Sequence, residues 1–258
     1  MRTILAVARV VILELIRRKD VYVLLFLTVL ITLLLGSVNL FGDAKIARYL
    51  KEVCLTLIWI SSLIIAIATA ARQIPAERES RTIFPLLAKP VTRGQVMMGK
   101  FLGCWVACGL ALSAFYVFFC ILSGSREHDW PLASYFQAFW LHWMFCGVVV
   151  ALTLFGSVMF TAVSSNATIL FVAVGGILLL ARHLHKVAVK TGGAAGKFLD
   201  ALYFSLPHLE WYDVRDLIVH NWPRLDWTII GQDTLYGVAY ASLFLLLARA
   251  RFRRMALN

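Results

Sequence analysis

The stretch from Gly94 to Lys100 reads GQVMMGK and follows the phosphate-binding loop of nucleotide hydrolases up to its last position. In that loop the lysine is followed by Ser or Thr, whose hydroxyl coordinates Mg²⁺. Here the next residue is Phe101, no buried strand precedes the stretch, and a membrane-length apolar run follows it. The sequence therefore predicts a chain that is not itself an enzyme and binds no cofactor. Any ATP–Mg²⁺ chemistry is expected in a partner.

Histidine clusters are the next candidates for chemistry. His183, His185, His208 and His220 fall within 38 positions near the C-terminus. Imidazole nitrogens are common ligands of copper and zinc, so a metal site is one interpretation. Polar residues at a membrane interface are the other, and we favour it because the spread is wide. The expected metal site is therefore none.

Two further features carry less chemistry. Cys104 and Cys108 lie four residues apart, but no His or acid adjoins them, so they are expected to pack as small apolar residues. All five cysteines lie in apolar runs, and no disulfide framework is implied.

His142 stands in the first turns of an apolar run. An ionisable residue inside a membrane is a functional candidate, but it has no charged partner nearby in sequence, and the substrate residues stay unassigned.

The apolar residues that surround these positions are gathered in blocks. The chain is 61% hydrophobic and 15% charged, and a helix needs roughly 20 apolar residues to cross a bilayer. Residues 1–19 carry too many arginines for a span and predict an interfacial amphipathic helix. The sequence predicts an all-α integral membrane protein, a single domain over 1–258, with six transmembrane helices at 21–41, 53–71, 93–122, 136–162, 166–182 and 230–248.

The charge distribution predicts the orientation. If both termini are cytoplasmic and the spans alternate, the inner segments hold 15 Lys or Arg and 4 acids, whereas the outer segments hold 10 of each. The whole net charge of +11 then lies on the inner side, in agreement with the positive-inside rule. The basic residues are better explained as orientation signals and contacts with anionic membrane lipid than as a nucleic-acid site.

The region 74–91 between the second and third spans is the most highly charged connection. Pro75 suits the first turn of a helix, and Glu77 and Glu79 near that end complement its dipole. Glu77 and Arg81 are also spaced four apart in the favourable order. These residues predict a short cytoplasmic helix over 76–83, which we call the coupling helix.

The third span is expected to begin before the membrane. Thr92 and Gln95 have the spacing of a capping box, with Val91 and Val96 at the hydrophobic staple positions. A helix over 93–122 would be about 45 Å long and would project into the cytoplasm by roughly 15 Å.

The outer segment 183–232 is the longest connection. Gly196–Leu206 and Glu210–His220 predict two short amphipathic helices separated by Pro207, forming an outer helical hairpin. A connection of this length with its own secondary structure is usually functional.

Three motifs in the charged region resemble those of ABC-2-type permeases, the membrane components of ABC exporters. The resemblance is closest to the branch that serves multicopper-enzyme maturation, and it covers nearly the whole chain. Two positions depart from the family pattern: Ser80 stands where Gly is common, and Pro85 falls where the family continues a helix. The motifs are Glu77-Arg78-Glu79-x-x-Thr82, then Leu86-Leu87-Ala88-Lys89-Pro90-Val91-x-Arg93, then Gly99-Lys100-Phe101.

The resemblance implies a permease subunit of an ATP-driven transporter, exporting an unidentified substrate across the cytoplasmic membrane. It implies two copies of an ABC ATP-binding subunit and a second permease chain, as a homodimer or heterodimer. Docking of the coupling helix on the ATPase would rock spans one, two and five. The residues expected to make this coupling contact are Glu77, Arg78, Glu79, Arg81, Thr82, Lys89, Pro90 and Arg93.

Two other classes of protein are alternatives. A secondary transporter would need ionisable groups within the membrane, and the first five spans contain essentially none. A membrane anchor or assembly factor for a partner ATPase or maturation complex, without transport, remains open because the architecture alone does not prove flux.

Overall fold

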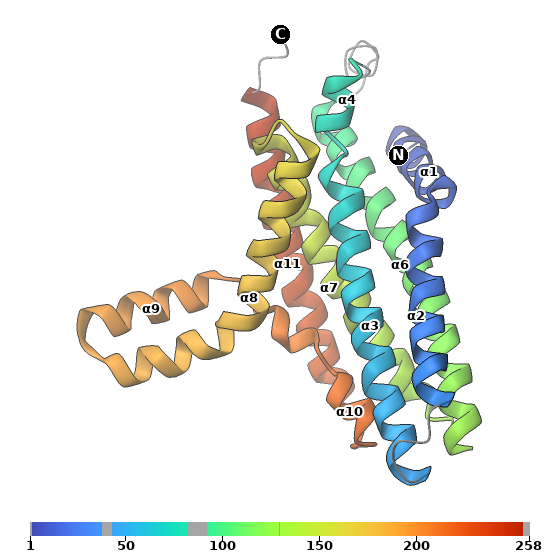
Figure 1. Cartoon of the computed structure of the whole chain (residues 1–258). Coiled ribbons are helices and arrows are strands. Elements are labelled where there is room, and N and C mark those ends of the chain that lie inside the picture. Colours follow the sequence, from blue (N-terminus) through green and yellow to red (C-terminus); the bar gives the residue numbers. More distant parts are fainter. Residues whose placement is uncertain (1, 38–42, 82–91, 129, 255–258) are drawn as a thin grey trace.

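The computed structural model describes residues 2–37, 43–81, 92–128 and 130–254, and this part of the chain contains helices and no strand. Figure 1 shows most of the long helices running side by side, with both termini and α4 at one end of the bundle. The helices are α1 (Arg2–Arg17), α2 (Lys19–Ser37), α3 (Asp43–Ala71), α4 (Pro75–Glu79), α6 (Arg93–Glu127), α7 (Leu132–Met159), α8 (Val163–Thr191), α9 (Gly193–Ser205), the 3-10 helix η1 (Leu209–Tyr212), α10 (Arg215–Val219) and α11 (Trp227–Arg254).

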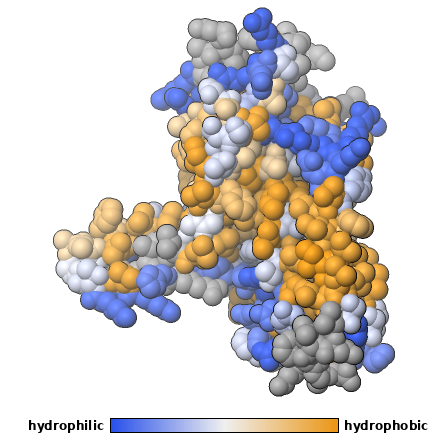
Figure 2. Space-filling model, viewed as in Figure 1, coloured by the Kyte–Doolittle hydropathy of each residue, from blue (hydrophilic) through white to orange (hydrophobic). Residues whose placement is uncertain are grey.

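Five of these helices, α2, α3, α6, α7 and α11, are long and apolar enough to cross a membrane, and the first half of α8 is a shorter apolar helix. The prediction of an all-α membrane protein with about six spans is confirmed. In α7, 72% of the most apolar stretch is buried, against 17% in α2. The core is therefore built around α3, α6 and α7, while α2 presents most of its surface to lipid. Figure 2 shows this apolar surface between two polar ends.

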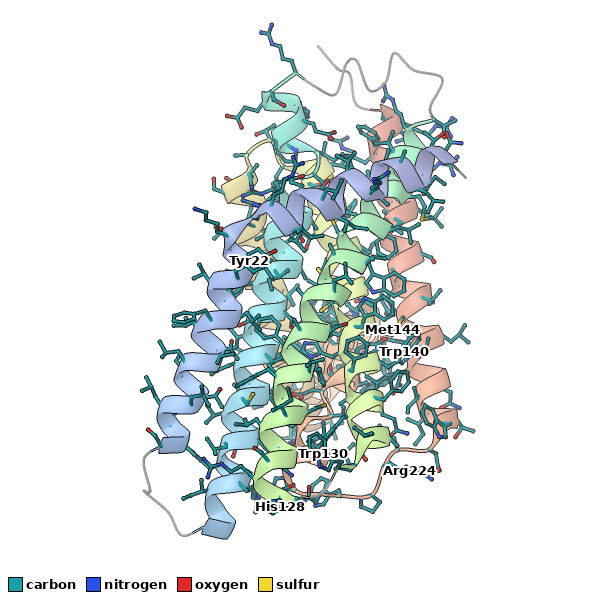
Figure 3. The ribbon with its side chains drawn as sticks, turned by 90° about the vertical axis from the view of Figure 1, so that its right-hand side faces the viewer. Tyr22, His128, Trp130, Trp140, Met144 and Arg224 are labelled. Carbon is teal, nitrogen blue, oxygen red and sulfur yellow. The ribbon has the colours of Figure 1, made fainter. Side chains whose placement is uncertain are left out.

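Helix α1 lies across the bundle near its upper end, almost perpendicular to α2, as Figure 3 shows. It packs along α6, and it buries one face through Ala8, Val11 and Leu15. Arg18 is the single residue between α1 and α2. The interfacial helix predicted for residues 1–19 therefore forms, and it ends two residues earlier than expected.

Helix α3 begins earlier than predicted. The second span was predicted at 53–71, but α3 already starts at Asp43. Charged residues mark where a span leaves the membrane without ending its helix, and here they are held by other elements. Lys51 is buried, pairs with Glu127 at the end of α6, and donates to Asn221 Oδ1 at 2.8 Å.

The second half of α8 forms an arm with α9 that projects sideways from the bundle in Figure 1. The predicted fifth span, 166–182, is only part of α8, which begins at Val163 and runs on to Thr191. Gly192 and Gly193 both have φ of 61°, a conformation that glycine adopts without steric cost, and they reverse the chain into α9. The predicted helix Gly196–Leu206 is confirmed within three residues. The predicted helix Glu210–His220 is wrong as one unit, because Asp213 and Val214 separate η1 from α10.

Candidate functional site

Helix α4 is shorter than the predicted coupling helix. It covers Pro75–Glu79 and is capped by Ser80, whose backbone N–H and hydroxyl both donate to the carbonyl of Ala76. Arg81 then adopts φ of 57°, in the left-handed region that interrupts a right-handed helix. The helix therefore ends at Glu79 rather than at residue 83. Pro85, which departs from the family pattern at a position where the family continues a helix, lies outside the described residues.

Helix α4 is tied to α6 through a buried lysine. Lys100 is 2% exposed, and its Nζ donates to Glu77 Oε1 at 2.6 Å and to the backbone carbonyl of Gln73 at 2.8 Å. The side chain of Gln73 adds Oε1 at 3.3 Å and itself donates to the carbonyl of Thr69 in α3. A buried ammonium is tolerated when it is paired and hydrogen-bonded. One lysine thus joins α3, α4 and α6.

The start of α6 is fixed in two ways. Thr92 Oγ1 accepts from the backbone N–H of Gln95, and the Gln95 side chain accepts from the backbone N–H of Thr92, so the predicted capping box is confirmed. Arg93 lies over the ring of Phe252, with its guanidinium carbon 5.4 Å from the ring centre, and donates to the carbonyl of Arg253 at 3.2 Å. The beginning of α6 is therefore joined to the end of α11.

Two glycines of α6 let α1 approach closely. A Cβ at Gly99 would lie 2.8 Å from Val7 Cβ, and one at Gly103 would lie 2.7 Å from Val11 Cβ. Real Cβ atoms essentially never come so close to another carbon. Because Gly99 directly precedes Lys100, the same turn of α6 contacts α1 on one side and α4 on another.

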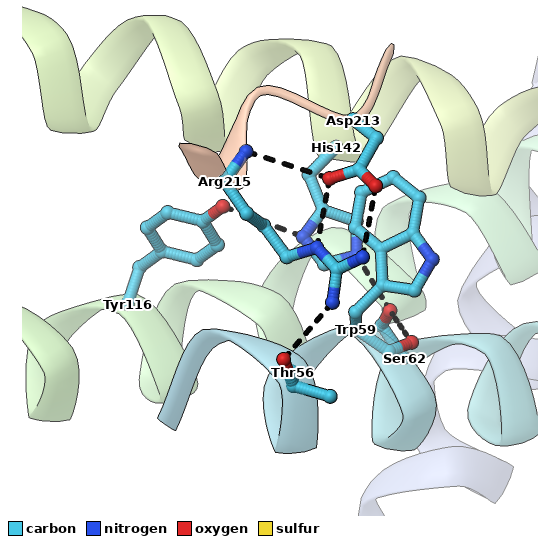
Figure 4. Close-up of polar contacts among 7 residues, drawn as sticks. All are labelled: Thr56, Trp59, Ser62, Tyr116, His142, Asp213 and Arg215. Atoms are coloured by element: carbon cyan, nitrogen blue, oxygen red, sulfur yellow. Dashed lines mark hydrogen bonds and ion pairs between the residues drawn. The ribbon is translucent and has the colours of Figure 1, made fainter. Parts of the chain in front are cut away.

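A second polar cluster lies deep between α3, α6 and α7, shown in Figure 4. His142 is buried; its Nε2 lies 2.6 Å from the Ser62 hydroxyl and its Nδ1 lies 3.4 Å from the Tyr116 hydroxyl. Trp59 packs against the imidazole with ring centres 4.4 Å apart. His142 has no charged partner nearby in sequence, and the two partners that the structure gives it are neutral hydroxyls. Its partners come from helices distant in sequence.

The connection between η1 and α10 covers this cluster. Arg215 forms a two-pronged ion pair with Asp213, at 2.7 and 2.8 Å, and donates to Thr56 Oγ1 at 3.0 Å. Its guanidinium also lies over Trp59, 5.3 Å from the ring centre. The hydrogen bonds to Asp213 raise the pKa of Arg215, so the guanidinium stays charged while it seals the outer end of the cluster.

Three of the four predicted histidines have described side chains, and these three do not gather around one point; the side chain of His185 lies outside the described part. His183 is exposed on the arm, His208 is buried among aromatic rings, and His220 contacts Arg48. In the described part of the chain, no group of three or more His, Cys, Asp or Glu side chains is arranged to hold a metal ion.

Comparison with known proteins identifies the family. Residues 46–257 match the family described as ABC-2 family transporter protein. The chain belongs to the ABC-2 transporter family. It is thus a multi-pass membrane component of an ABC transporter, a class whose membrane components generally partner with an ATP-binding subunit. No curated protein matches the chain, and the multicopper-enzyme-maturation branch stays a prediction.

On this ABC-2 chain, the structure separates the residues predicted to contact an ATPase. Arg78 is half-buried, and Glu79 and Arg81 are exposed at the tip of α4. Glu77 instead faces Lys100, and Arg93 faces the end of α11. The other three predicted residues lie outside the described residues: Thr82, Lys89 and Pro90.

Sequence reasoning missed Lys100 and Gln73. Lys100 was considered only as part of the phosphate-binding-loop pattern and of the Gly99-Lys100-Phe101 family motif. A charged residue at the start of an apolar run, eight positions after a capped helix start, was the available signal that it needs a buried partner. Gln73 gave no such signal, because its role depends on the turn that brings its carbonyl to α6.

Proposed function

We propose that this chain is the permease subunit of an ATP-driven exporter of the cytoplasmic membrane, and that the tip of α4 receives the motion of a separate ATPase subunit. ATP and Mg²⁺ are bound by that partner. The substrate stays unassigned. The observation that carries the proposal is the Lys100–Glu77 pair, because it connects a short helix with an exposed tip directly to a membrane-spanning one.

The position of α4 supports a docking role. It lies at the end of the bundle that also holds both termini (Figure 1), beyond the apolar belt (Figure 2). Arg78, Glu79 and Arg81 present both signs of charge there. Charged groups on an exposed, short helix suit the recognition of a complementary polar groove. The topological prediction places this end in the cytoplasm, where ATP is hydrolysed.

The contacts of α4 support transmission of force. Motion of α4 acts on Lys100 through Glu77, and Lys100 is rigidly held in α6. The same turn of α6 packs on α1 through Gly99. Packed helices move as units because interiors are close-packed, so α1 and α6 would follow α4 as one body.

The partners follow from the family and from the surface. ABC transporters work with paired membrane components, so we propose two ATPase copies and a second permease chain. Helix α8 offers a face for that chain, since Ile169, Phe171 and Val172 are between 44% and 68% exposed. A Cβ added at Gly175 or Gly176 beside them would meet no atom of another described element within 4 Å, and this open glycine surface permits close approach of another helix.

Charge reversal at the tip of α4 tests the proposal. In vesicles containing the transporter, the double variant Arg78→Glu and Glu79→Lys should weaken ATPase association at least tenfold, with transport lost in parallel. The matched control is Arg224→Glu, an exposed charge at the opposite end of the bundle (Figure 3). Intact association in the α4 variant contradicts the docking role. Association without any substrate-stimulated ATP hydrolysis, in the unmodified protein, supports a membrane anchor instead.

A further inference from the structure

We propose that an anionic phospholipid binds at the junction of α1, α2 and α6, with an acyl chain in an apolar cavity and its phosphate against Arg18 and Arg72. The site belongs to the leaflet on the α4 side of the bundle. The proposal concerns lipid recognition only and does not depend on the proposed coupling to an ATPase.

The cavity lies beneath the bend between α1 and α2. Its volume is about 160 Å³, and its walls are almost entirely apolar. An engineered protein cavity of about 150 Å³ binds benzene and excludes water, so this volume suits a segment of a hydrocarbon chain. The residues that form its walls include Ile12, Leu15, Val21, Leu25, Ala107 and Ala111.

The rim of the cavity opens toward the membrane rather than into the core. Ile16, Tyr22 and Leu110 line it and are 49%, 55% and 53% exposed. Tyr22 marks the place in Figure 3, just below the point where α1 meets α2. Its hydroxyl donates to the carbonyl of Ile16 at 2.9 Å, which closes the bend. An acyl chain can therefore enter from the side without crossing a polar layer.

A positively charged crevice adjoins the cavity and shares Leu15 and Ala107 with it. Arg18 and Arg72 line this crevice, and Arg72 Nε is buried with no hydrogen-bond partner in the described part of the chain. A buried donor without a partner costs about 1–3 kcal/mol. The guanidinium fork matches phosphate oxygens in geometry. The crevice itself has room for about one water molecule (about 10 Å³), so the phosphate lies at its mouth.

The acids near the crevice do not neutralise it. Glu14 lines it, and Asp20 pairs with Arg18 at 3.3 Å. Asp20 is 68% exposed, and exposed ion pairs are worth little, so a phosphate can displace it. Arg17 and Lys19 flank Arg18 in sequence, leaving four basic groups against two acids. This charge favours an anionic headgroup over a zwitterionic one.

A lipid explains the combination better than a second copy of the chain does. A helix from another copy would supply side chains to the apolar cavity but no anion to the arginines. A phospholipid supplies both from one molecule, at the depth where the apolar surface of Figure 2 meets the polar end.

Native mass spectrometry of the full chain tests the proposal. The detergent-purified protein is mixed with phosphatidylglycerol or phosphatidylcholine of the same acyl chains, and bound lipid is counted. We expect tighter binding of phosphatidylglycerol, reduced about fivefold by each of Arg18→Gln and Arg72→Gln, the effect of losing one basic contact with an anionic lipid. The control Arg9→Gln, an exposed arginine on α1, should bind as the unmodified protein does.

A second variant tests the cavity separately. Ala114 lines the cavity and is exposed at its rim, so Ala114→Phe fills it without overpacking the core. Both lipids should bind at least tenfold more weakly, whereas Ala6→Phe, on the exposed side of α1, should change nothing. Equal binding of the two lipids, or retention by Ala114→Phe, overturns the proposal. So does release of lipid by millimolar inorganic phosphate, or a change in oligomeric mass with lipid binding unaffected.

Discussion

At the scale of single residues, Lys100 is a buried charge whose stability depends on its partners. Its charge is buried and satisfied by Glu77 and Gln73. Removing one partner of a buried pair costs about 3–5 kcal/mol, and Glu77 is 31% exposed, so we expect Glu77→Gln to cost about 3 kcal/mol of unfolding free energy. Chemical unfolding in detergent measures it.

The same pair offers an internal control. The double variant Glu77→Gln with Lys100→Met leaves no buried charge, so it should regain most of the stability that Glu77→Gln loses. Glu79→Gln, two residues along the same helix but exposed, should be neutral. A double variant that adds the losses of its two single changes would falsify the idea that these two charges interact.

His208 predicts a pH dependence of the outer side. Burial lowers the pKa of His208 although the nearby Glu210 carboxylate raises it. At pH values between that lowered pKa and the unfolded value of about 6.5, the imidazole of His208 is protonated in the unfolded chain and neutral in the folded protein. The contribution of His208 to the free energy of unfolding is therefore fully present above pH 6.5. It falls as the pH drops below 6.5, by at most about 1.4 kcal/mol per pH unit.

The packing around His208 sets the region affected. Its imidazole lies 4.3 Å from the ring centre of Tyr203 in α9, and its backbone N–H donates to the Tyr236 hydroxyl in α11 at 3.0 Å. Acidification should loosen the attachment of the arm to α11, measured by hydrogen exchange of α9 between pH 7.5 and 5.5. His208→Phe should flatten this dependence, and His183→Phe should keep it. An unchanged profile in His208→Phe assigns the effect to other groups.

At the scale of elements, the contact of α1 with α6 depends on glycine. A Cβ at Gly103 would meet both Val11 Cβ and the backbone oxygen of Ala8, at 2.7 and 2.9 Å. Backbone cannot move aside as a side chain can, so we expect Gly103→Ala to cost about 1–3 kcal/mol and to lift α1 from α6. Gly175→Ala, in open space, is the control.

Cysteine accessibility measures that separation. A cysteine at the buried position Ala8 should react slowly with a maleimide in the unmodified background and in Gly175→Ala. It should react at least several-fold faster in Gly103→Ala. Equal rates in all three backgrounds would mean that α6 adapts to the new methyl group with α1 still in place.

The elements were largely predictable from the sequence because apolar runs and helix caps are local signals. The capping box of Thr92 and Gln95 predicted the start of α6 at Arg93 to the residue, whereas its end at Glu127 lies five residues beyond the predicted 122. The continuation of α3 through residues 43–52 was missed, because the partners that hold Lys51 lie at Glu127 and Asn221. Contacts between residues so far apart in the sequence produce no periodic pattern along the chain.

The candidate site was predictable only in part for the same reason. The α4 region stood out through its charge, and the choice of Glu77 as an important residue was made from its helix position. The structure gives Glu77 an inward partner instead of an outward one. Similarly, His142 had no charged partner in sequence, but Ser62 and Tyr116 reach it from two other helices.

At the scale of the whole molecule, the distribution of charge predicts a single orientation. The tip of α4 and the basic end of α11 lie at one end of the bundle, and His128 and Arg224 lie at the other, as Figures 1 and 3 show. Moving the basic ends outward would oppose the positive-inside rule. We therefore expect Glu79 and Arg224, both exposed, to face opposite sides of the membrane.

Labelling with a membrane-impermeant maleimide tests this orientation. Four native cysteines are buried and Cys120 lies within α6, so their background reaction should be low. In right-side-out vesicles, a cysteine replacing Arg224 should be labelled and one replacing Glu79 should not, with the pattern reversed in inside-out vesicles. Each membrane crossing changes the side on which the chain lies. Labelling of both positions from one side therefore requires an even number of crossings between them, whereas three are predicted. If that labelling occurs in right-side-out vesicles, α4 lies on the outer side and cannot meet an ATPase.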